Sequence, residues 1–162
     1  MSWALHRVDD RLIHGQVVVA WGHQLRPRRI WVVDDASAAN DWERDLLADA
    51  APGVEVKVVP LEEGIRIHAD EAVAEGAALL LVRDLRTAVA LVEGGAIIPA
   101  LNLGGLHYAP GRSRVNDYVY LDEDDRARCR RLLELGVRLE VQDVPATRSR
   151  PLLEIDPAIA RT

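Results

Sequence analysis

Residues 7–17 read Arg7-Val8-Asp9-Asp10-Arg11-Leu12-Ile13-His14-Gly15-Gln16-Val17, and they join a predicted strand to a predicted helix. The apolar run over residues 3–8 is typical of a short strand. Over residues 15–25, apolar side chains recur close to helical spacing. A strand that feeds a helix through a short polar loop is the repeating unit of α/β folds. The stretch therefore predicts the first such unit.

The same alternation continues along the chain. Apolar runs predict strands at residues 30–33, 54–59, 77–82, 97–103 and 137–141, with a short candidate at 118–120, and helices at 38–51, 61–74, 84–92 and 122–135. Because these strands carry almost no polar residues, we expect both faces of a mostly parallel sheet to be covered. We therefore predict an α/β fold: one three-layer α/β/α domain over residues 1–162, with about six to seven strands. Residues 146–162 are expected to be a weakly structured tail.

Composition narrows the class of protein. Apolar residues make up 49% of the chain and Phe is absent, so the core must be built from Val, Leu, Ile and Ala. The net charge of −6 argues against nucleic acid as the main partner. Cys129 is the single cysteine, and no apolar run reaches membrane-spanning length. We expect a soluble, cytoplasmic protein.

Lys57 is the only lysine, so an anion site would rely on arginine.

Polar residues follow several predicted strands. They stand at residues 9–14, 34–35, 83–84 and 102–105, each after the end of a strand. Ligands of open α/β sheets bind beyond the carboxyl ends of the strands. We expect these four segments to converge on one rim of the sheet.

The first of these loops has the residues for phosphoryl chemistry. His14 precedes Gly15 at a predicted helix start, where free N–H groups and the helix dipole favour an anion. Arg11 can add a bidentate contact to a phosphate. Either Asp9 or Asp10 can hold one imidazole nitrogen and leave the other as the nucleophile. These residues favour a phosphohistidine at His14, with Gly15 and Arg11 at the phosphate.

The residues alone also allow ordinary roles. A loop histidine is commonly a surface residue, the acids can form a simple salt bridge with Arg11, and Gly15 can merely relieve crowding. His6 is expected to be packed in the sheet, and His107 is a second-tier site candidate. We expect solvated rings for His23 and His68, and turn-stabilising roles for Asn102 and Asn116. No metal-ligand spacing is present, so we predict no metal site. Gly104-Gly105 is too little for a dinucleotide motif.

A resemblance extends over nearly the whole chain. The motif RVDDRLIHGQV, Trp21 and the segment RRIWVVDD resemble the opening of IIB components of the mannose/fructose/sorbose family of the phosphoenolpyruvate-dependent sugar phosphotransferase system (PTS). The likeness continues through LLADAAPGVEVKVV, ALVEGGAIIPALNLGGLHYAPGRSRVNDYVYLDEDD and LLELGVRLEVQDVP. It covers about residues 3–145 and implies the same mostly parallel α/β/α fold.

The resemblance implies a protein-Nπ-phosphohistidine–sugar phosphotransferase. A IIA partner would donate a phosphoryl group to Nδ1 of His14, and a sugar bound by the membrane IIC and IID subunits would accept it. The family's motif arginine corresponds to Arg11, and its adjoining acids correspond to Asp9 and Asp10. We expect Arg11 to bind the phosphate, with Arg7 as a weaker second candidate. No cofactor is implied.

One segment departs from the family pattern, and two other functions stay open. Arg83-Asp84-Leu85-Arg86 stands where many members have a Thr/Pro-containing loop, which bears on how partners dock. The alternatives are a regulatory phosphoprotein that transports no sugar, and a nucleotide- or sugar-binding domain in which His14 only contacts the ligand. The sequence identifies no sugar and leaves open whether the chain forms a homo-oligomer.

Overall fold

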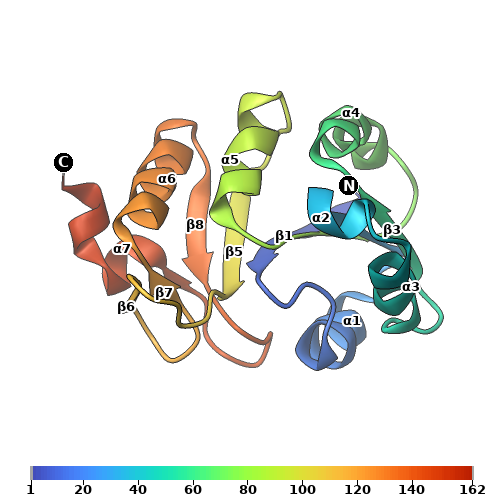
Figure 1. The fold of residues 1–162 in the computed structure, drawn as a ribbon, viewed down its shortest axis with the longest axis horizontal. Helices are drawn as coiled ribbons and strands as arrows, with labels where there is room; N and C mark the ends of the chain where they lie inside the picture. The colour runs from blue at the N-terminus through green and yellow to red at the C-terminus, as the bar shows by residue number, and fades with distance from the viewer. Residues whose placement is uncertain (1, 162) are drawn as a thin grey trace.

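A seven-stranded sheet forms the middle layer of the fold (Figure 1). The computed structural model describes residues 2–161. The strand order is β3-β2-β4-β1-β5-β8-β9, and every neighbouring pair is parallel except β8 and β9. The strands are β1 (Trp3–Asp9), β2 (Arg29–Val33), β3 (Glu55–Val59), β4 (Ala78–Val82), β5 (Ala100–Gly105), β8 (Arg138–Val141) and β9 (Arg150–Pro151). The predicted α/β fold and mostly parallel sheet are confirmed.

Helices cover both faces of this sheet. They are η1 (Gln16–Trp21), α1 (Gly22–Leu25), α2 (Asp35–Ala38), α3 (Asp41–Asp49), α4 (Leu61–Ala72), α5 (Leu85–Glu93), α6 (Glu123–Glu134), α7 (Leu152–Ile155) and η2 (Pro157–Ala160). Figure 1 shows α4, α5 and α6 on one side of the sheet and α1 and α3 on the other. The three-layer arrangement is therefore confirmed.

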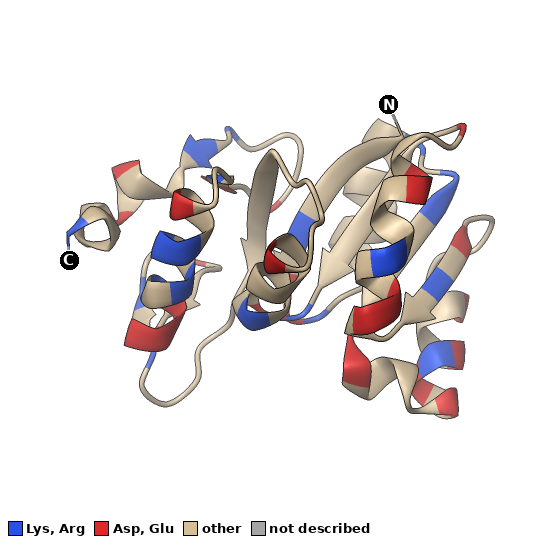
Figure 2. Ribbon diagram, turned by 90° about the horizontal axis from the view of Figure 1, so that it is seen from above, with Lys and Arg blue, Asp and Glu red and all other residues tan. Residues whose placement is uncertain are grey.

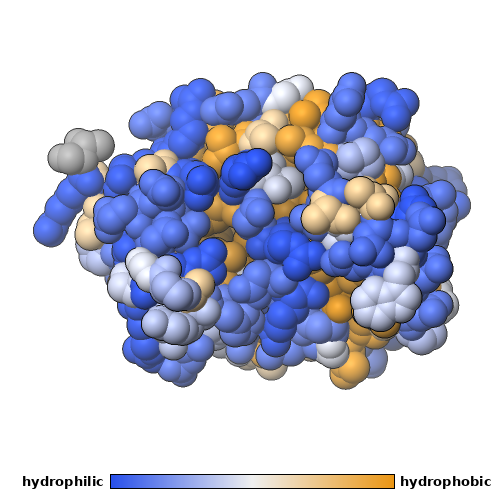
Figure 3. All heavy atoms as spheres, in the orientation of Figure 1, coloured by the Kyte–Doolittle hydropathy of each residue, from blue (hydrophilic) through white to orange (hydrophobic). Residues whose placement is uncertain are grey.

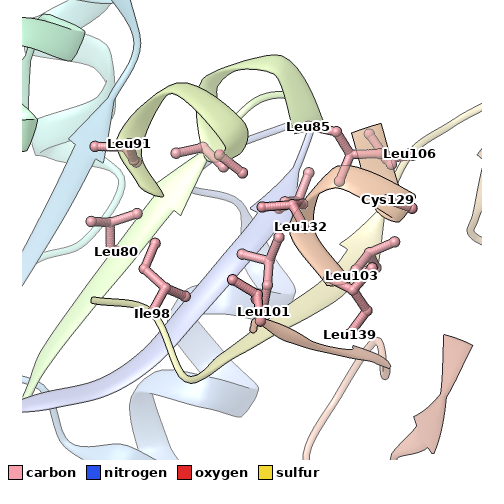
Figure 4. Close-up of a cluster of buried hydrophobic side chains, with 14 of the residues drawn as sticks. Leu80, Leu85, Leu91, Ile98, Leu101, Leu103, Leu106, Cys129, Leu132 and Leu139 are labelled. Carbon is pink, nitrogen blue, oxygen red and sulfur yellow. The ribbon is translucent and has the colours of Figure 1, made fainter. Parts of the chain in front are cut away.

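Strand β4 divides the core between the two faces. Leu80 packs in the cluster under α5 and α6, whereas Leu79 and Leu81 pack in the cluster with η1 and α3. All three leucines have no exposed surface. Figure 4 shows the first cluster, in which aliphatic side chains of α5 and α6 meet those of the sheet. The alternation of side chains along a strand places one apolar run in two cores, as expected for a buried parallel strand.

The helix predicted over residues 15–25 has two parts. Gln16–Trp21 is a π-helix, in which the N–H of Gly22 donates to the carbonyl of Val17, and α1 follows it. Arg26 ends α1 in the left-handed region with φ 47°, ahead of Pro27. Short π-helical segments often occur at functional sites, and this one begins two residues after His14.

The end of the chain is more ordered than predicted. β9 pairs with β8, and α7 and η2 follow it. Leu152 and Ile159 are fully buried in the core that contains α6. The expectation of a weakly structured tail is therefore wrong, because these two apolar side chains anchor the segment.

A separate two-stranded ladder joins β6 (Ser113–Arg114) to β7 (Tyr120–Leu121). Within residues 2–161, no helix is both long enough and apolar enough to cross a bilayer.

Two glycines of β5 leave room for charged side chains of β1. Arg7 pairs with Asn102, and the register then shifts so that Asp9 lies opposite Gly105. A Cβ on Gly104 would lie 1.9 Å from Cζ of Arg7, and one on Gly105 would lie 2.9 Å from Oδ1 of Asp9. Both positions therefore need glycine for space, so that the guanidinium and the carboxylate can occupy the interior of the fold.

Two histidines meet between β1 and α4. Nε2 of His6 lies 2.9 Å from Nε2 of His68, and the ring of Trp3 stacks on that of His68 at 4.8 Å. The packing predicted for His6 is confirmed, but the solvated position predicted for His68 is wrong, because its side chain is only 3% exposed. Burial and the neighbouring His68 lower the pKa of His6 to about 3, and burial lowers that of His68.

The glycine contact predicts a large stability effect. Gly104→Ala should lower the free energy of unfolding by about 3 kcal/mol, because the new methyl group displaces a buried guanidinium from its partners. Gly22→Ala is the matched control: its Cβ would meet only a carbonyl at 3.5 Å, in helical backbone. Urea unfolding measures both. Equal stability of Gly104→Ala and wild type would contradict this expectation, because the Arg7 guanidinium would then have moved without loss of stability.

The histidine pair predicts acid sensitivity. Its pKa values are lowered in the folded state, so the unfolded chain takes up protons first as the pH falls below about 6.5. Stability should be complete above that pH and should decrease by roughly 1.4 kcal/mol per pH unit for His6 on the way to pH 5, with a further decrease from His68 in the same direction. Denaturant unfolding across this range measures the slope. His6→Gln should reduce the slope, whereas His23→Gln, at an exposed position, should leave it unchanged; an unchanged slope in His6→Gln would contradict this assignment.

Candidate functional site

The four polar segments predicted to meet do converge at one rim of the sheet. Arg83, after β4, hydrogen-bonds the Asp34 carboxylate after β2 at 3.3 Å and the backbone carbonyl of Asp10 at 3.4 Å. Arg7 of β1 donates to Oδ1 of Asn102 on β5 at 2.7 Å. These contacts connect the carboxyl ends of β2, β4, β1 and β5, and so confirm that the segments share this rim.

Asp9 is the centre of the hydrogen-bond network. Its carboxylate has no exposed surface and forms an ion pair with Arg7 at 3.1 Å. The backbone N–H of Arg11 donates to it at 3.0 Å, and the Arg11 guanidinium lies 3.3 Å away. His14 completes the set, with Nε2 2.8 Å from Oδ2. Of the two acids that the sequence offered, it is Asp9 that holds the imidazole.

This contact leaves the other ring nitrogen of His14 available. With Nε2 donating to a buried carboxylate, the ring is in the Nε2–H tautomer and Nδ1 carries a lone pair. No hydrogen bond among residues 2–161 uses Nδ1 of His14. The side chain is 16% exposed, so the ring is held by the protein while one edge remains open to solvent. This geometry suits a nucleophilic nitrogen.

A left-handed turn brings His14 back to Asp9. Leu12 has φ 57°, and its N–H donates to the carbonyl of Asp9 at 2.9 Å. This backbone conformation is costly for a residue with a side chain. The Leu12 side chain is 1% exposed and packs with Ile13 and Val17 in the core, which compensates for the cost. The turn lets two residues five apart in the sequence form a short contact.

The surrounding donors keep Asp9 ionised. Burial by itself would raise the pKa of Asp9, but the hydrogen bonds from His14 and the Arg11 backbone, together with the charge of Arg7, lower it to about 2. A permanent negative charge therefore lies under the imidazole. Such a charge stabilises a ring that becomes more positive during reaction.

The two arginines of the loop occupy different environments. The side chain of Arg11 is 39% exposed and also reaches Oε1 of Gln16 at 3.2 Å. Arg7 has no exposed surface and donates to Asp9, Asn102 and the carbonyl of Gln142. Its burial does not fit the prediction that Arg7 is a second phosphate ligand: no phosphate can reach it in this structure, and it positions Asp9 instead.

Asp10 holds a different histidine from the one the sequence suggested. Its carboxylate accepts from the backbone N–H of His107 at 2.8 Å and lies 2.7 Å from Nδ1 of the same residue. It therefore does not orient His14, and it fixes the segment after β5 instead. Gly15, the other predicted phosphate contact, has open space around its Cα: a Cβ there would meet nothing within 4 Å.

A recess lies beside the loop on the side of α3. It has a volume of about 400 Å³ and is lined by Asp10, Arg11, Leu12, Ile13, Glu43, Leu46, Leu47, Asp49, Ala50 and Arg83. Trp42, on the same helix, is 72% exposed. Acidic and basic residues are interspersed over the helices in Figure 2, and the face in Figure 3 is mostly hydrophilic with apolar atoms between the charged groups.

Sequence reasoning missed the groups that support Asp9 from a distance. The carbonyl of Gln142 accepts from Arg7, and Trp21 lies under the same guanidinium at 5.5 Å and donates to the carbonyl of Asp143. The only sequence signal was the Asn102–Gly105 segment, whose paired glycines indicate a close approach. Asn116, by contrast, stabilises a turn as expected, accepting from the N–H groups of Tyr118 and Val119.

Comparison with known proteins identifies the family of the chain. The family model of the PTS system sorbose subfamily IIB component matches residues 3–160. The sorbose-specific EIIB component of Lacticaseibacillus casei is 35% identical over 154 residues, which cover 94% of each chain. The mannose-specific EIIAB component of Escherichia coli is 38% identical over 145 residues, covering 89% of this chain and 45% of that longer protein.

Solved structures of similar proteins have the same fold. The IIBSor domain of the sorbose permease from Klebsiella pneumoniae superposes with a TM-score of 0.89 at 32% identity, covering 100% of both chains. The N-acetylgalactosamine-specific IIB component 1 from Escherichia coli has a TM-score of 0.85 at 30% identity, covering 92% of this chain and 98% of that one. The chain therefore belongs to the sorbose subfamily of PTS IIB components, a family of phosphotransferases in sugar transport.

Proposed function

We propose that this chain carries a phosphoryl group on Nδ1 of His14, between a IIA donor and a sugar acceptor. The observation that carries the proposal is the short contact of Nε2 with buried Asp9, which leaves Nδ1 as the free nitrogen of a fixed ring. Family membership supports the reaction class, and the unpartnered Nδ1 supports the choice of atom. A histidine that served only as a ligand contact would not need an ionised, fully buried carboxylate behind it.

The transfer itself needs little from the protein beyond position and charge. The lone pair of Nδ1 attacks the phosphorus of the donor's phosphohistidine, so that a P–N bond forms on His14 as the donor's P–N bond breaks. Nε2 keeps its proton, and Asp9 offsets the positive charge that the ring acquires. In the second step a sugar hydroxyl attacks the same phosphorus, the electron pair of the breaking P–N bond returns to Nδ1 of His14, and the hydroxyl proton passes to solvent.

Arg11 is the group that we assign to the phosphoryl oxygens. Its guanidinium is partly exposed, unlike that of Arg7, and lies 3.4 Å from the Asp9 oxygen that also contacts the imidazole. A phosphoryl group on Nδ1 would lie by Gly15, where the backbone leaves room. Arg11 would then exchange part of its contact with Asp9 for the phosphate. Charge-assisted contacts of this kind neutralise the equatorial oxygens without enclosing the group.

The proposed partners follow from the family. A IIA domain would approach the rim at His14, and the membrane IIC and IID subunits would present the sugar to the same face. The chain would then act in the cytoplasm, with peripheral association at the membrane during transfer. The mannose-specific relative named EIIAB component is in keeping with a IIA donor.

Phosphotransfer from a labelled IIA protein tests the site directly. Wild type should acquire an acid-labile phosphoryl group, and His14→Ala should acquire none. His107→Ala and His23→Ala are the matched controls and should be labelled as wild type. Mass spectrometry locates the modified residue. Label on His14→Ala equal to that on wild type would refute the proposal, whereas labelling of His14 without sugar phosphorylation on membranes containing IIC and IID would indicate a regulatory phosphoprotein.

Asp9 should control the rate through the tautomer. Asp9→Asn removes the charge behind the ring and releases Nε2, so we expect phosphorylation of His14 to slow by about 10²-fold or more. Nitrogen NMR of the His14 ring should show a pure Nε2–H tautomer in wild type and a mixture in the variant. Circular dichroism checks that the variant is folded, since Arg7 loses its counter-charge. A folded variant with the wild-type rate would remove Asp9 from the mechanism.

A further inference from the structure

An exposed apolar strip lies along α3. Trp42 is 72% exposed and Leu46 is 54% exposed, and Ala50, at the end of the helix, is exposed as well. Residues four apart are neighbours on a helix surface, so these three side chains form one continuous strip. The helix packs on the core through Leu47 instead, so the fold does not need the strip. Contiguous apolar side chains on a charged surface commonly mark sites of protein contact.

The strip leads into the recess beside the His14 loop. Leu46 and Ala50 line this recess together with Arg11 and Ile13, which lie three residues and one residue before His14. The Arg11 guanidinium reaches the buried carboxylate that also contacts the His14 ring. A protein interface of ordinary size covers about 800 Å² of each partner. A partner that brings a reacting group to His14 can therefore cover the recess and the strip in the same interface.

The basic groups near the strip already have acidic partners. Arg44, the one arginine of α3, forms an ion pair with Asp41. Arg83, in the wall of the recess, lies 3.0 Å from Oε1 of Glu43. Both guanidinium groups are therefore neutralised within the chain.

Two carboxylates beside the strip have no such partner. Asp45 and Asp49 stand three residues after Trp42 and Leu46, so each carboxylate lies next to the strip. Both residues are exposed, and neither forms an ion pair within residues 2–161. The strip is thus flanked by two negative charges that a partner can neutralise. This pattern fits a segment that has an apolar side chain next to Lys or Arg.

We propose that the strip and the recess bind a basic cytoplasmic loop of the membrane IIC–IID acceptor, with an apolar side chain of that loop in the recess. Cytoplasmic loops of membrane proteins carry an excess of Lys and Arg, the charge that Asp45 and Asp49 attract. The recess volume of about 400 Å³ accommodates a large apolar side chain. Anionic lipid itself does not match, because it repels a chain with a net charge of −6. The inference rests on the proposed function of His14 and names the surface by which the chain reaches its acceptor.

Binding of the unphosphorylated full chain to membranes tests the surface without any phosphoryl transfer. Phosphatidylethanolamine–phosphatidylglycerol vesicles that contain IIC and IID should bind the chain, and the same vesicles without these subunits should not. Trp42→Ala and Asp49→Lys should each weaken binding by about tenfold, because one removes apolar contact area and the other repels the basic loop. Val73→Ala and Glu75→Lys are the matched controls, at exposed positions outside the strip, and should bind as wild type does.

Labelling of the same variants by phosphorylated IIA separates this inference from the proposed function. Trp42→Ala and Asp49→Lys should be labelled on His14 at the wild-type rate. Sugar phosphorylation on membranes containing IIC and IID should then show a KM for the phosphorylated variant raised about tenfold, with kcat unchanged. Absence of label on wild type would refute the role of His14, while the binding measurement would still decide the surface.

Three results would overturn the inference. Trp42→Ala could bind the IIC–IID vesicles as wild type does, or vesicles without the subunits could bind the chain equally well. In the third case, Trp42→Ala would slow labelling by IIA and keep wild-type membrane binding, which would assign the surface to the phosphoryl donor. Circular dichroism checks that the variants are folded, as expected for substitutions at exposed positions.

Discussion

The buried ion pair of Arg7 and Asp9 is the interaction on which the site depends. Two charges without exposed surface are costly unless each is fully partnered. Asn102, the carbonyl of Gln142 and the Arg11 backbone supply further hydrogen bonds, and among residues 2–161 only Nε of Arg7 in this pair has no partner. The Asp9 carboxylate of this pair therefore keeps a negative charge in contact with Nε2 of His14. The protein obtains an oriented imidazole from a contact that contributes little by itself to stability.

The site also depends on the glycines of β5 and on the turn at Leu12. Gly104 and Gly105 remove the side chains that would occupy the space of the guanidinium and the carboxylate. Leu12 accepts a left-handed backbone so that the loop returns to its own strand. Neither feature touches a phosphoryl group, yet both fix where His14 lies. The chemistry of the loop therefore depends on packing in the neighbouring strand.

Much of the fold was predictable because the strands are uniformly apolar and the helices keep their period. The convergence of polar segments at one rim followed from parallel topology, and the proposal of His14 as the phosphohistidine followed from its loop and its family resemblance. Local patterns did not distinguish Asp9 from Asp10, because adjacent side chains of a strand face opposite layers and the sequence does not say which layer holds the histidine. Nor did they show that His68 is buried, because its partner lies 62 residues away. Arg7 was misjudged for the same reason.

The sequence separations of these contacts have a consequence for folding. Asp9, Arg11 and His14 can meet early, since they belong to one short loop. The acceptors that complete Arg7 lie 95 and 135 residues further along the chain, on β5 and just after β8. Contacts of such separation form late, after the loops between them have closed. A nascent or truncated chain therefore contains His14 but not the contacts that support it, so the arrangement proposed for phosphoryl transfer is complete only when nearly the whole polypeptide has folded.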